Sequence, residues 1–493
     1  MSINASRREF LRRASLIGGT VGAAGAPFAL NLSMMNAAAA QAAGGYKAIV
    51  CLFLYGGNDS ANMVLPTDAA SWTAYTTTRS TAPDPIALRA VGTAPNTAAG
   101  TGLLDYIGGV LPIVPNFTAF AAPNNTRTYA LHPTMVEAQT LFTAGRLGVI
   151  ANAGPLIEPI ANKAAYRSNA SRKPAKLFSH NDQQSTWQAM APEGAKVGWG
   201  GKLGDLVASS NTQAIFTNIS ASGNAVFMAG NTVFQYQVGS GGATSIRGLP
   251  GVDANLFGSA AAGTALQNLI TADNSHLFAK EYNAITKRSV DARGAFQAAY
   301  APTDAAVPQV TPYNNPVTRA TANNGLAQQL RTVARIISAS SSLGATRQIF
   351  FVSMGGFDTH DNENRSHSDL MARLSHALGE FDRLLGARRN EVTLFTGSDF
   401  GRTFTSNGDG TDHGWGAHHF VMGGAVRGKE IYGRFPQVGL NHDDEVGSGS
   451  FLPQVSVDQI GGTLGKWFGV SDANLDLVFP NLRNFQRDLG FFA

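Results

Sequence analysis

Three aspartates of the sequence stand directly after apolar runs that have the length of buried strands. Asp59 follows residues 46–55, Asp358 follows residues 347–354, and Asp399 follows residues 391–396. Each aspartate comes after a turn that contains glycine. Because the carboxyl ends of parallel strands meet at one edge of a sheet, we expect the three carboxylates to lie at a common crevice.

Histidines occur in the same late loops as these aspartates. His360 lies two residues beyond Asp358, and the sequence Asp412-His413-Gly414 comes shortly after Asp399. A hard or borderline divalent cation takes oxygen and imidazole ligands brought together from several loops. The pattern therefore predicts a site for Zn, Mn, Mg or Ca. Its expected ligands are Asp59, Asp358, His360, Asp399 and His413.

The assignment of His413 rests on a loop that contains Gly408, Gly410 and Gly414. Glycine allows backbone to approach an ion closely because it reaches left-handed conformations without steric cost. Either Asp412 or His413 is a candidate ligand. Imidazole suits borderline-soft zinc and favours His413, which leaves Asp412 to orient a neighbouring group.

A nucleophile is expected beside such a metal, and Ser179 is the candidate because it opens the helix-like segment after it. Metal coordination lowers the pKa of a hydroxyl, and a helix N-terminus holds anions. The alternative is that Ser179 only caps the helix. His180 either donates to a substrate oxygen or covers a neighbouring turn. Arg402, directly after the Asp399 loop, either binds an anion through its guanidinium or forms a structural ion pair.

The elements that must position these residues alternate between strand and helix, which predicts an α/β fold with a mostly parallel sheet flanked by helices. Residues 66–130 indicate a loop-rich insertion. Residues 205–320 are expected to form an inserted Ser/Gly-rich cap with one helix over 261–300. The expected strands are 46–55, 147–152, 347–354, 391–396 and 419–422, and the expected helices are 135–144, 323–341, 367–388 and 456–468.

The composition of the 493 residues excludes several classes of protein. With 44% hydrophobic and 14% charged residues, the chain is not intrinsically disordered. Four of its basic residues lie among the first 40, so the rest is nearly neutral and gives no case for binding nucleic acid. The single cysteine, Cys51, excludes an intrachain disulfide and a cysteine-based zinc site.

The first 42 residues have the pattern of a twin-arginine export signal. Arg7 and Arg8 precede Phe10 and Leu11, and a mild apolar stretch and small residues follow. Glycines and Pro27 interrupt the stretch, so a stable membrane span is not expected. We therefore expect residues 1–42 to engage the twin-arginine translocase. Residues 43–493 would then form one domain that is periplasmic or secreted.

Taken together, these motifs resemble the domain-of-unknown-function 1501 family, a sulfatase-like bacterial family that looks like a branch of the alkaline-phosphatase superfamily. The matching stretches are 54–59, 132–133, 179–180, 355–360, 398–403, 410–415, 467–469 and 479–482. The resemblance implies an alkaline-phosphatase-like sheet with one or two metal ions at the strand ends and an alcohol nucleophile that attacks phosphorus or sulfur. By order along the chain, it implies that Ser179 is the nucleophile.

The resemblance also assigns the metal ligands by order. Asp59 looks like the first-strand aspartate, and Asp358 and His360 look like the ligand pair of one metal. Asp399 resembles the aspartate of the other metal, and His413 the final histidine.

The sequence departs from the superfamily pattern in three places. Phosphatases of the superfamily have a histidine where this chain has Phe400, which puts a second metal in question. The Asp358–His360 pair is closer in sequence than the usual ligand pair. Sulfatases carry a Cys/Ser-x-Pro-x-Arg signature, whereas Ser179 is followed by His-Asn-Asp-Gln, so the sulfatase modification is not expected.

Two functions of different classes follow from these observations. The first is an exported metal-dependent hydrolase of phosphate or sulfate esters, in which Ser179 attacks and Arg402 and the helix N-terminus carry transition-state charge. Its substrate is a small-molecule or glycan-linked anionic ester. The second is a non-catalytic envelope protein that uses a degenerate hydrolase fold for binding or assembly. Convergence of the five expected ligands within about 5 Å of one point separates the two.

Overall fold

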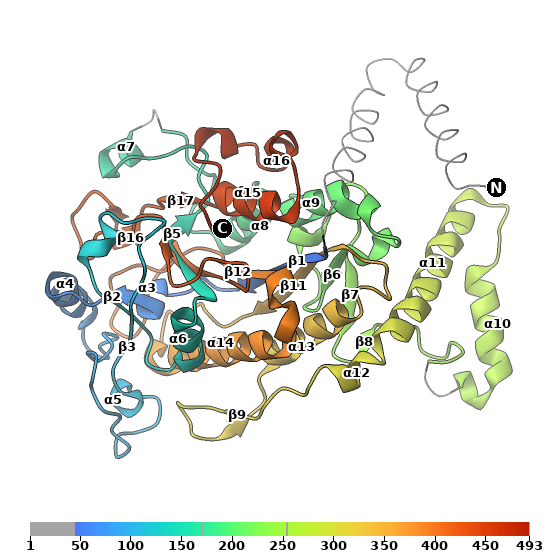
Figure 1. Cartoon of the computed structure of the whole chain (residues 1–493), viewed down its shortest axis with the longest axis horizontal. Coiled ribbons are helices and arrows are strands. Elements are labelled where there is room, and N and C mark those ends of the chain that lie inside the picture. The colour runs from blue at the N-terminus through green and yellow to red at the C-terminus, as the bar shows by residue number, and fades with distance from the viewer. Residues whose placement is uncertain (1–44, 169–170, 253–254, 493) are drawn as a thin grey trace.

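The computed structural model describes residues 45–168, 171–252 and 255–492 (Figure 1). The expected export signal at 1–42 lies outside these residues. None of the helices in the described ranges combines the length and the apolar character needed to cross a bilayer.

Three adjacent parallel strands form the centre of the molecule. β1 (Lys47–Leu54) lies between β11 (Arg347–Met354) and β12 (Val392–Ser398) and pairs in parallel with both. Along β1, Leu52 packs into the core on one face of the sheet and Phe53 into the core on the other. A strand covered on both faces reads as a continuous apolar run, which is why the sequence predicted it so clearly.

Seven shorter or outer strands extend this sheet to ten. The main path runs β14-β5-β13-β12-β1-β11-β6-β7-β8, and β17 pairs with β5. Only the β12–β13, β13–β5 and β7–β8 pairs are antiparallel. The additional strands are β5 (Leu147–Gly154), β6 (Asn218–Ser220), β7 (Tyr236–Gly239), β8 (Gly242–Ala243), β13 (Ala417–Gly423), β14 (Ile431–Tyr432) and β17 (Val455–Ser456).

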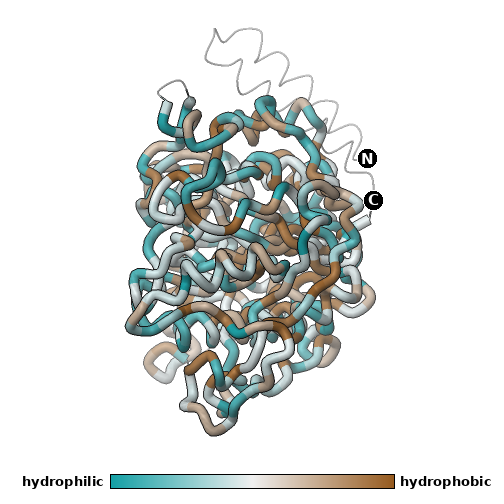
Figure 2. Tube along the Cα trace, turned by 90° about the vertical axis from the view of Figure 1, so that its left-hand side faces the viewer, coloured by the Kyte–Doolittle hydropathy of each residue, from teal (hydrophilic) through white to brown (hydrophobic). Residues whose placement is uncertain are grey.

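Helices cover both faces of the sheet, so the predicted α/β class with a mostly parallel sheet is confirmed (Figure 1). One face carries α6 (Val136–Thr143), α13 (Gly325–Ser338) and α14 (Glu363–Leu385). The other carries α8 (His180–Ala189), α9 (Trp199–Val207), α15 (Val457–Phe468) and α16 (Asp472–Val478). In Figure 2, apolar segments run through the interior of the view and polar segments are common at its periphery.

The Ser/Gly-rich region over 205–320 has two parts. Its first part supplies β6, β7 and β8 to the main sheet. Its second part holds α10 (Ala260–Thr271) and α11 (Leu277–Tyr300), which extend from the body in Figure 1. The single helix expected over 261–300 is therefore wrong, because a turn interrupts it. In that turn the side chain of Asn274 accepts a hydrogen bond from the backbone N–H of His276.

Smaller elements occupy the edges of the fold. A three-stranded sheet in the order β2-β4-β3 lies beside the main one, and two strand pairs, β9–β10 and β15–β16, close loops. These strands are β2 (Val64–Pro66), β3 (Leu111–Ile113), β4 (Tyr129–Leu131), β9 (Tyr313–Asn314), β10 (Thr321–Ala322), β15 (Glu445–Gly447) and β16 (Ser450–Phe451). The remaining α-helices are α3 (Ser60–Met63), α4 (Ala69–Arg79), α5 (Leu104–Ile107), α7 (Lys163–Arg167) and α12 (Thr303–Ala306).

Candidate metal centre

Three histidines and one aspartate converge at the carboxyl ends of the central strands. The side chains of His180, Asp358 and His413 each offer a ligand atom, and these atoms lie within 4.8 Å of one another. His360 joins them: its Nε2 is 3.2 Å from Asp358 Oδ1 and 3.0 Å from His413 Nε2. These four side chains, the metal cluster below, come from α8 and from the loops after β11 and β12.

The hydrogen bonds of the imidazoles decide which nitrogen of each ring faces the cluster. His180 Nδ1 is 2.7 Å from Asp399 Oδ2, and His413 Nδ1 is 2.8 Å from the backbone oxygen of Phe178. His360 Nδ1 is 3.2 Å from Asp412 Oδ1. Carboxylates and backbone carbonyls only accept hydrogen bonds, so each Nδ1 carries a proton, and in the neutral ring each Nε2 presents a lone pair.

This donor set fits a divalent cation. Three Nε2 lone pairs and the Asp358 carboxylate face one another, and groups that only accept cannot satisfy each other. A cation between them resolves the conflict, and three imidazoles with one carboxylate are a ligand set that zinc and similar ions take. Fixing Nδ1 by an oxygen acceptor is also how proteins orient metal-binding histidines.

The electrostatics of the cluster agree with that assignment. Burial opposes ionisation of Asp358, but the hydrogen bond and charge of Arg402 outweigh it and hold the pKa of Asp358 below its usual range. Burial lowers the pKa of His413, which keeps its imidazole neutral. The side chains of His413 and Asp358 are 26% and 45% exposed. The cluster is therefore open to solvent.

Close backbone approaches hold the loops of the cluster together. At Gly56 φ is +118°, and a Cβ built there would lie 2.4 Å from the backbone nitrogen of Asp358. At Gly410 a Cβ would lie 2.5 Å from the backbone of His360. The glycines of the 408–414 loop thus serve contacts between loops, and not only an approach to an ion. The backbone N–H of Thr411 donates to Thr359 O at 3.0 Å and fixes the two loops to each other.

Asp399 lies behind His180 and not among the four converging side chains. It is fully buried, and its Oδ2 accepts from Gln184 Nε2 at 2.8 Å and from Gly56 N at 3.2 Å as well as from His180. The hydrogen bond with Asp399 raises the pKa of His180, because it stabilises the charged imidazole. Asp399 therefore orients the ligand His180.

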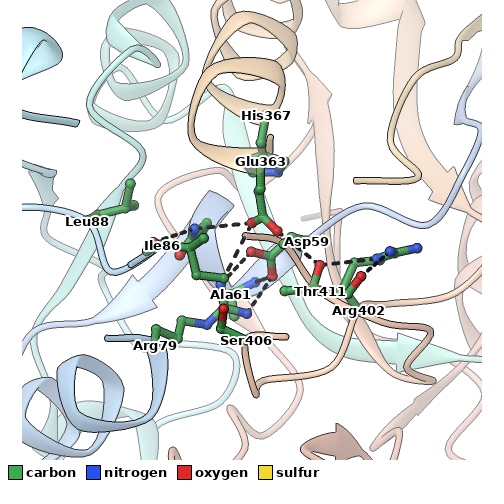
Figure 3. A network of polar contacts seen from close by, with 12 residues as sticks. Asp59, Ala61, Arg79, Ile86, Leu88, Glu363, His367, Arg402, Ser406 and Thr411 are labelled. Atoms are coloured by element: carbon green, nitrogen blue, oxygen red, sulfur yellow. Dashed lines mark hydrogen bonds and ion pairs between the residues drawn. The ribbon is translucent and has the colours of Figure 1, made fainter. Parts of the chain in front are cut away.

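Asp59, also expected as a ligand, lies in a separate buried network (Figure 3). Its carboxylate receives both terminal nitrogens of Arg79, at 2.5 and 2.9 Å, and it accepts from the backbone of Ala61 at the start of α3. Burial opposes the charge, but Arg79 outweighs it and holds the pKa of Asp59 well below its usual range. Of the five expected ligands, the structure thus brings Asp358, His360 and His413 together and adds His180.

Glu363 and Thr411 connect this network to Arg402, as Figure 3 shows. Thr411 Oγ1 donates to Glu363 Oε2 at 3.0 Å and accepts from Arg402 Nε at 3.2 Å. Burial and the charge of Asp59 raise the pKa of Glu363 well above its usual range, which favours the protonated form of this carboxyl. The connected chain of side chains ends at Asp358 in the metal cluster, whose Oδ1 is 2.6 Å from Arg402 Nη1.

Arg402 itself is a supporting residue in this geometry. Its side chain is fully buried, and its guanidinium donates to the backbone oxygens of Gly56 and Thr411 besides Asp358 and the Thr411 hydroxyl. These bonds direct the guanidinium at protein acceptors. Of the two alternatives that the sequence left open, the structure favours the ion pair over a group that faces substrate.

Ser179 precedes the ligand His180 in the chain, and Phe400 packs against the cluster. Ser179 precedes the first residue of α8, and its Oγ donates to Asp182 Oδ2 at 2.8 Å. Phe400 is buried, and its ring centroid lies 4.8 Å from that of His180 and 4.6 Å from that of His413. An aromatic ring therefore fills the space beside the two imidazoles where the phosphatase pattern would have another ligand.

Sequence reasoning named His180 without making it a ligand, but it did expect Asp412 to orient a neighbouring group, which in the structure is His360. What pointed to His180 in the sequence was its position next to Ser179 at the start of a predicted helix. The polar face of that helix meets the edge of the sheet. Nothing local in the sequence shows that Asp399 would take its Nδ1 hydrogen, because that contact joins positions 219 residues apart.

The chain belongs to the family described as "Protein of unknown function (DUF1501)", whose profile matches residues 46–459. No protein with a curated description matches it. Among solved structures, it is similar to a Bacteroides thetaiotaomicron protein from a study of the metabolism of multiple glycosaminoglycans, labelled BT33494S-sulf. That match has 9% identity and a TM-score of 0.34, and covers 91% of this chain and 77% of the other.

A second solved structure is Ps i-CgsB in complex with k-i-k-neocarrahexaose. It has 10% identity and a TM-score of 0.31, and the match covers 90% of this chain and 78% of that one. Superpositions at these TM-scores are too loose to carry an argument about function.

Proposed function

We propose that this DUF1501 protein is a metal-dependent hydrolase of phosphate or sulfate esters, with one divalent cation held by His180, Asp358, His360 and His413. The observation that carries the proposal is the set of three Nε2 lone pairs turned on one carboxylate at the solvent-open ends of parallel strands. Such ends are where α/β folds place their functional crevice. An alkaline-phosphatase-like architecture, expected from the motifs, is part of the same proposal.

The cation, when bound, supplies Lewis acidity: it polarises an ester oxygen and lowers the pKa of a hydroxyl beside it. Phe400 supports one cation, because its ring occupies the space next to His180 and His413. The cation could be Zn, Mn, Mg or Ca, and the three imidazoles favour a borderline ion such as zinc over Mg or Ca.

Ser179 is the proposed nucleophile. Its neighbours on both sides are tied to the cluster, Phe178 through its carbonyl to His413 and His180 as a ligand. Its hydroxyl already donates to Asp182, which can take the proton when Oγ attacks. The new Oγ–phosphorus or Oγ–sulfur bond forms as the bond to the alcohol oxygen breaks, and the alcohol leaves with the proton that Asp182 took. Water then attacks phosphorus or sulfur, the bond to Oγ breaks, and one proton of the water returns to Oγ.

Arg402 acts in this proposal through Asp358. By pairing with one carboxylate oxygen, it fixes the direction in which Asp358 faces the three imidazoles. The backbone N–H groups at the start of α8 are then the protein's own donors for the anionic group, because a helix N-terminus attracts negative charge.

The cellular location of the protein is proposed from the sequence of its first 42 residues. Their paired arginines, mild apolar stretch and small residues support export by the twin-arginine route, with the mature protein in the periplasm or secreted.

An activity screen tests the proposal. Purified protein, stripped and reloaded with Zn, Mn, Mg or Ca in turn, is assayed on phosphate monoesters, phosphate diesters and sulfate esters. We expect turnover of at least one class with one of the ions, and loss of it in Ser179→Ala but not in Ser80→Ala, an exposed serine at the end of α4. Metal binding without turnover of any class would instead favour the non-catalytic envelope protein.

A further inference from the structure

A depression of about 280 Å³ runs along α8, the helix that begins at His180. Four side chains of α8 form one wall, spaced so that they share a face of the helix: Asn181, Gln184, Ser185 and Gln188. Tyr55, from the end of β1, and the segments 193–195 and 224–226 complete the lining.

Two residues of the lining connect the depression to the metal cluster, although none of the four cluster side chains lines it. Asn181 follows the proposed ligand His180 in the chain, and Gln184 Nε2 donates to Asp399, the carboxylate that holds His180 Nδ1. The wall of α8 therefore leads from the cation outward, so a substrate whose anionic group is at the cluster has its remaining part beside these amides.

The lining has the chemistry that binds hydroxyl groups and not a further charge. It contains no Lys, Arg or His, and Glu193 is its one ionisable carboxylate. Carboxamides offer a donor and an acceptor side by side, which suits hydroxyls that both donate and accept. Among the described residues, Gln184 Oε1 and Asn224 Nδ2 have no hydrogen-bond partner, while Gln188 Oε1 is held by the backbone N–H of Phe227 at 3.2 Å. Burial raises the pKa of Tyr55, so its hydroxyl stays a neutral donor.

We propose that this depression binds the alcohol part of the ester and that this alcohol is a neutral polyol such as a sugar. The proposal rests on the proposed function for the position of the anionic group. An aryl or alkyl ester would gain no hydrogen bond from the exposed amides of Asn181 and Asn224, which would stay bound to water.

Two measurements test it with zinc-loaded protein. In the first, kcat and KM are compared for glucose 6-phosphate and glucose 6-sulfate against 4-nitrophenyl phosphate and sulfate. We expect kcat/KM at least tenfold higher for the sugar esters. In Asn181→Ala we expect KM for the sugar ester to rise about five- to tenfold with little change in kcat, the effect of one lost hydrogen bond. The matched control is Asn268→Ala, an exposed amide on α10, where we expect no change.

The second measurement needs no turnover. Saturation-transfer NMR detects binding of methyl glucoside and methyl galactoside, and Asn181→Ala should weaken the signal while Asn268→Ala should not. Glycoside binding that depends on Asn181 without hydrolysis of any ester would keep this inference and overturn the proposed function. Hydrolysis of nitrophenyl esters as efficient as that of sugar esters, with no glycoside bound, would overturn the inference and keep the function.

Discussion

His360 Nε2 and His413 Nε2 lie 3.0 Å apart, although the Nδ1 of each ring faces an oxygen that can only accept a hydrogen bond. Two neutral imidazoles in these tautomers would present lone pairs to each other. Only a proton or a metal ion between them makes the contact favourable, and Asp358 and His180 supply two more ligand atoms at the same place. The proposed function depends on this relationship.

Removal of one ligand should release the metal and leave the fold intact. We expect His413→Ala to weaken metal binding by more than the roughly 10–100-fold that follows from changing an outer partner of a ligand. Isothermal titration with zinc measures the affinity, and thermal unfolding monitors the fold. The control is His276→Ala, an exposed histidine before α11. Retention of stoichiometric metal by His413→Ala after dialysis against a mild chelator would exclude His413 as a ligand.

The variant Asp399→Asn tests whether Asp399 orients His180 or binds the cation itself. The asparagine keeps the shape but lacks the charge that binds the Nδ1 hydrogen of His180. We expect zinc affinity to fall by roughly 10–100-fold without being abolished. Competition with a chromogenic chelator measures this range. Complete loss of the metal, as large as that in His413→Ala, would instead mean that Asp399 binds the cation directly.

Thr411→Val tests the chain of contacts from Glu363 to Arg402. The substitution conserves shape but removes the hydroxyl that donates to Glu363 and accepts from Arg402. Because it leaves a buried carboxyl and a guanidinium nitrogen short of a partner, we expect a loss of about 1–3 kcal/mol in unfolding free energy, measured by urea denaturation. We also expect weaker zinc affinity, since Arg402 positions Asp358. Thr411→Ser should restore both quantities. Unchanged zinc affinity in the valine variant would show that the chain only supports the fold.

The fold could be predicted where a local sequence pattern indicates the structure, and it could not where the local pattern is weak. The continuous apolar runs that became β1, β11 and β12 predicted a buried parallel sheet, because only strands covered on both faces have that pattern. The helix at 261–300 was wrong because a five-residue turn inside an otherwise helical pattern leaves few local marks. The loops that hold the site could be predicted together with these strands, because each loop begins where a strand ends.

The roles of individual site residues were harder to predict than their region. Asp59 and Asp358 both follow central strands, yet Arg79 binds one and three imidazoles face the other. That difference arises from contacts between distant segments, which no local spacing encodes. The same holds for Arg402, whose buried partners come from the 56 and 411 loops.

A pH effect on stability should come from Asp458, outside the metal cluster. Burial raises the pKa of Asp458 from 3.8 to about 6. Between these values the unfolded chain is ionised there and the folded protein is not, so the folded state binds more protons and stability falls as pH rises. Above pH 6 both states are ionised and the penalty is constant. Asp458→Asn should therefore gain stability relative to the wild type by roughly 2 kcal/mol between pH 4 and pH 7. Urea denaturation at both pH values measures the difference, and a pH-independent difference would contradict it.

The metal content of the wild-type protein tests the central claim most directly. Protein isolated without chelators is analysed for Zn, Mn, Mg and Ca by elemental analysis, and apoprotein is titrated with each ion by calorimetry. We expect close to one equivalent of one divalent ion per chain, lost in His413→Ala and kept in His276→Ala. Less than about 0.1 equivalent of every ion, with no saturable binding in the titration, would contradict a metal centre at His180, Asp358, His360 and His413.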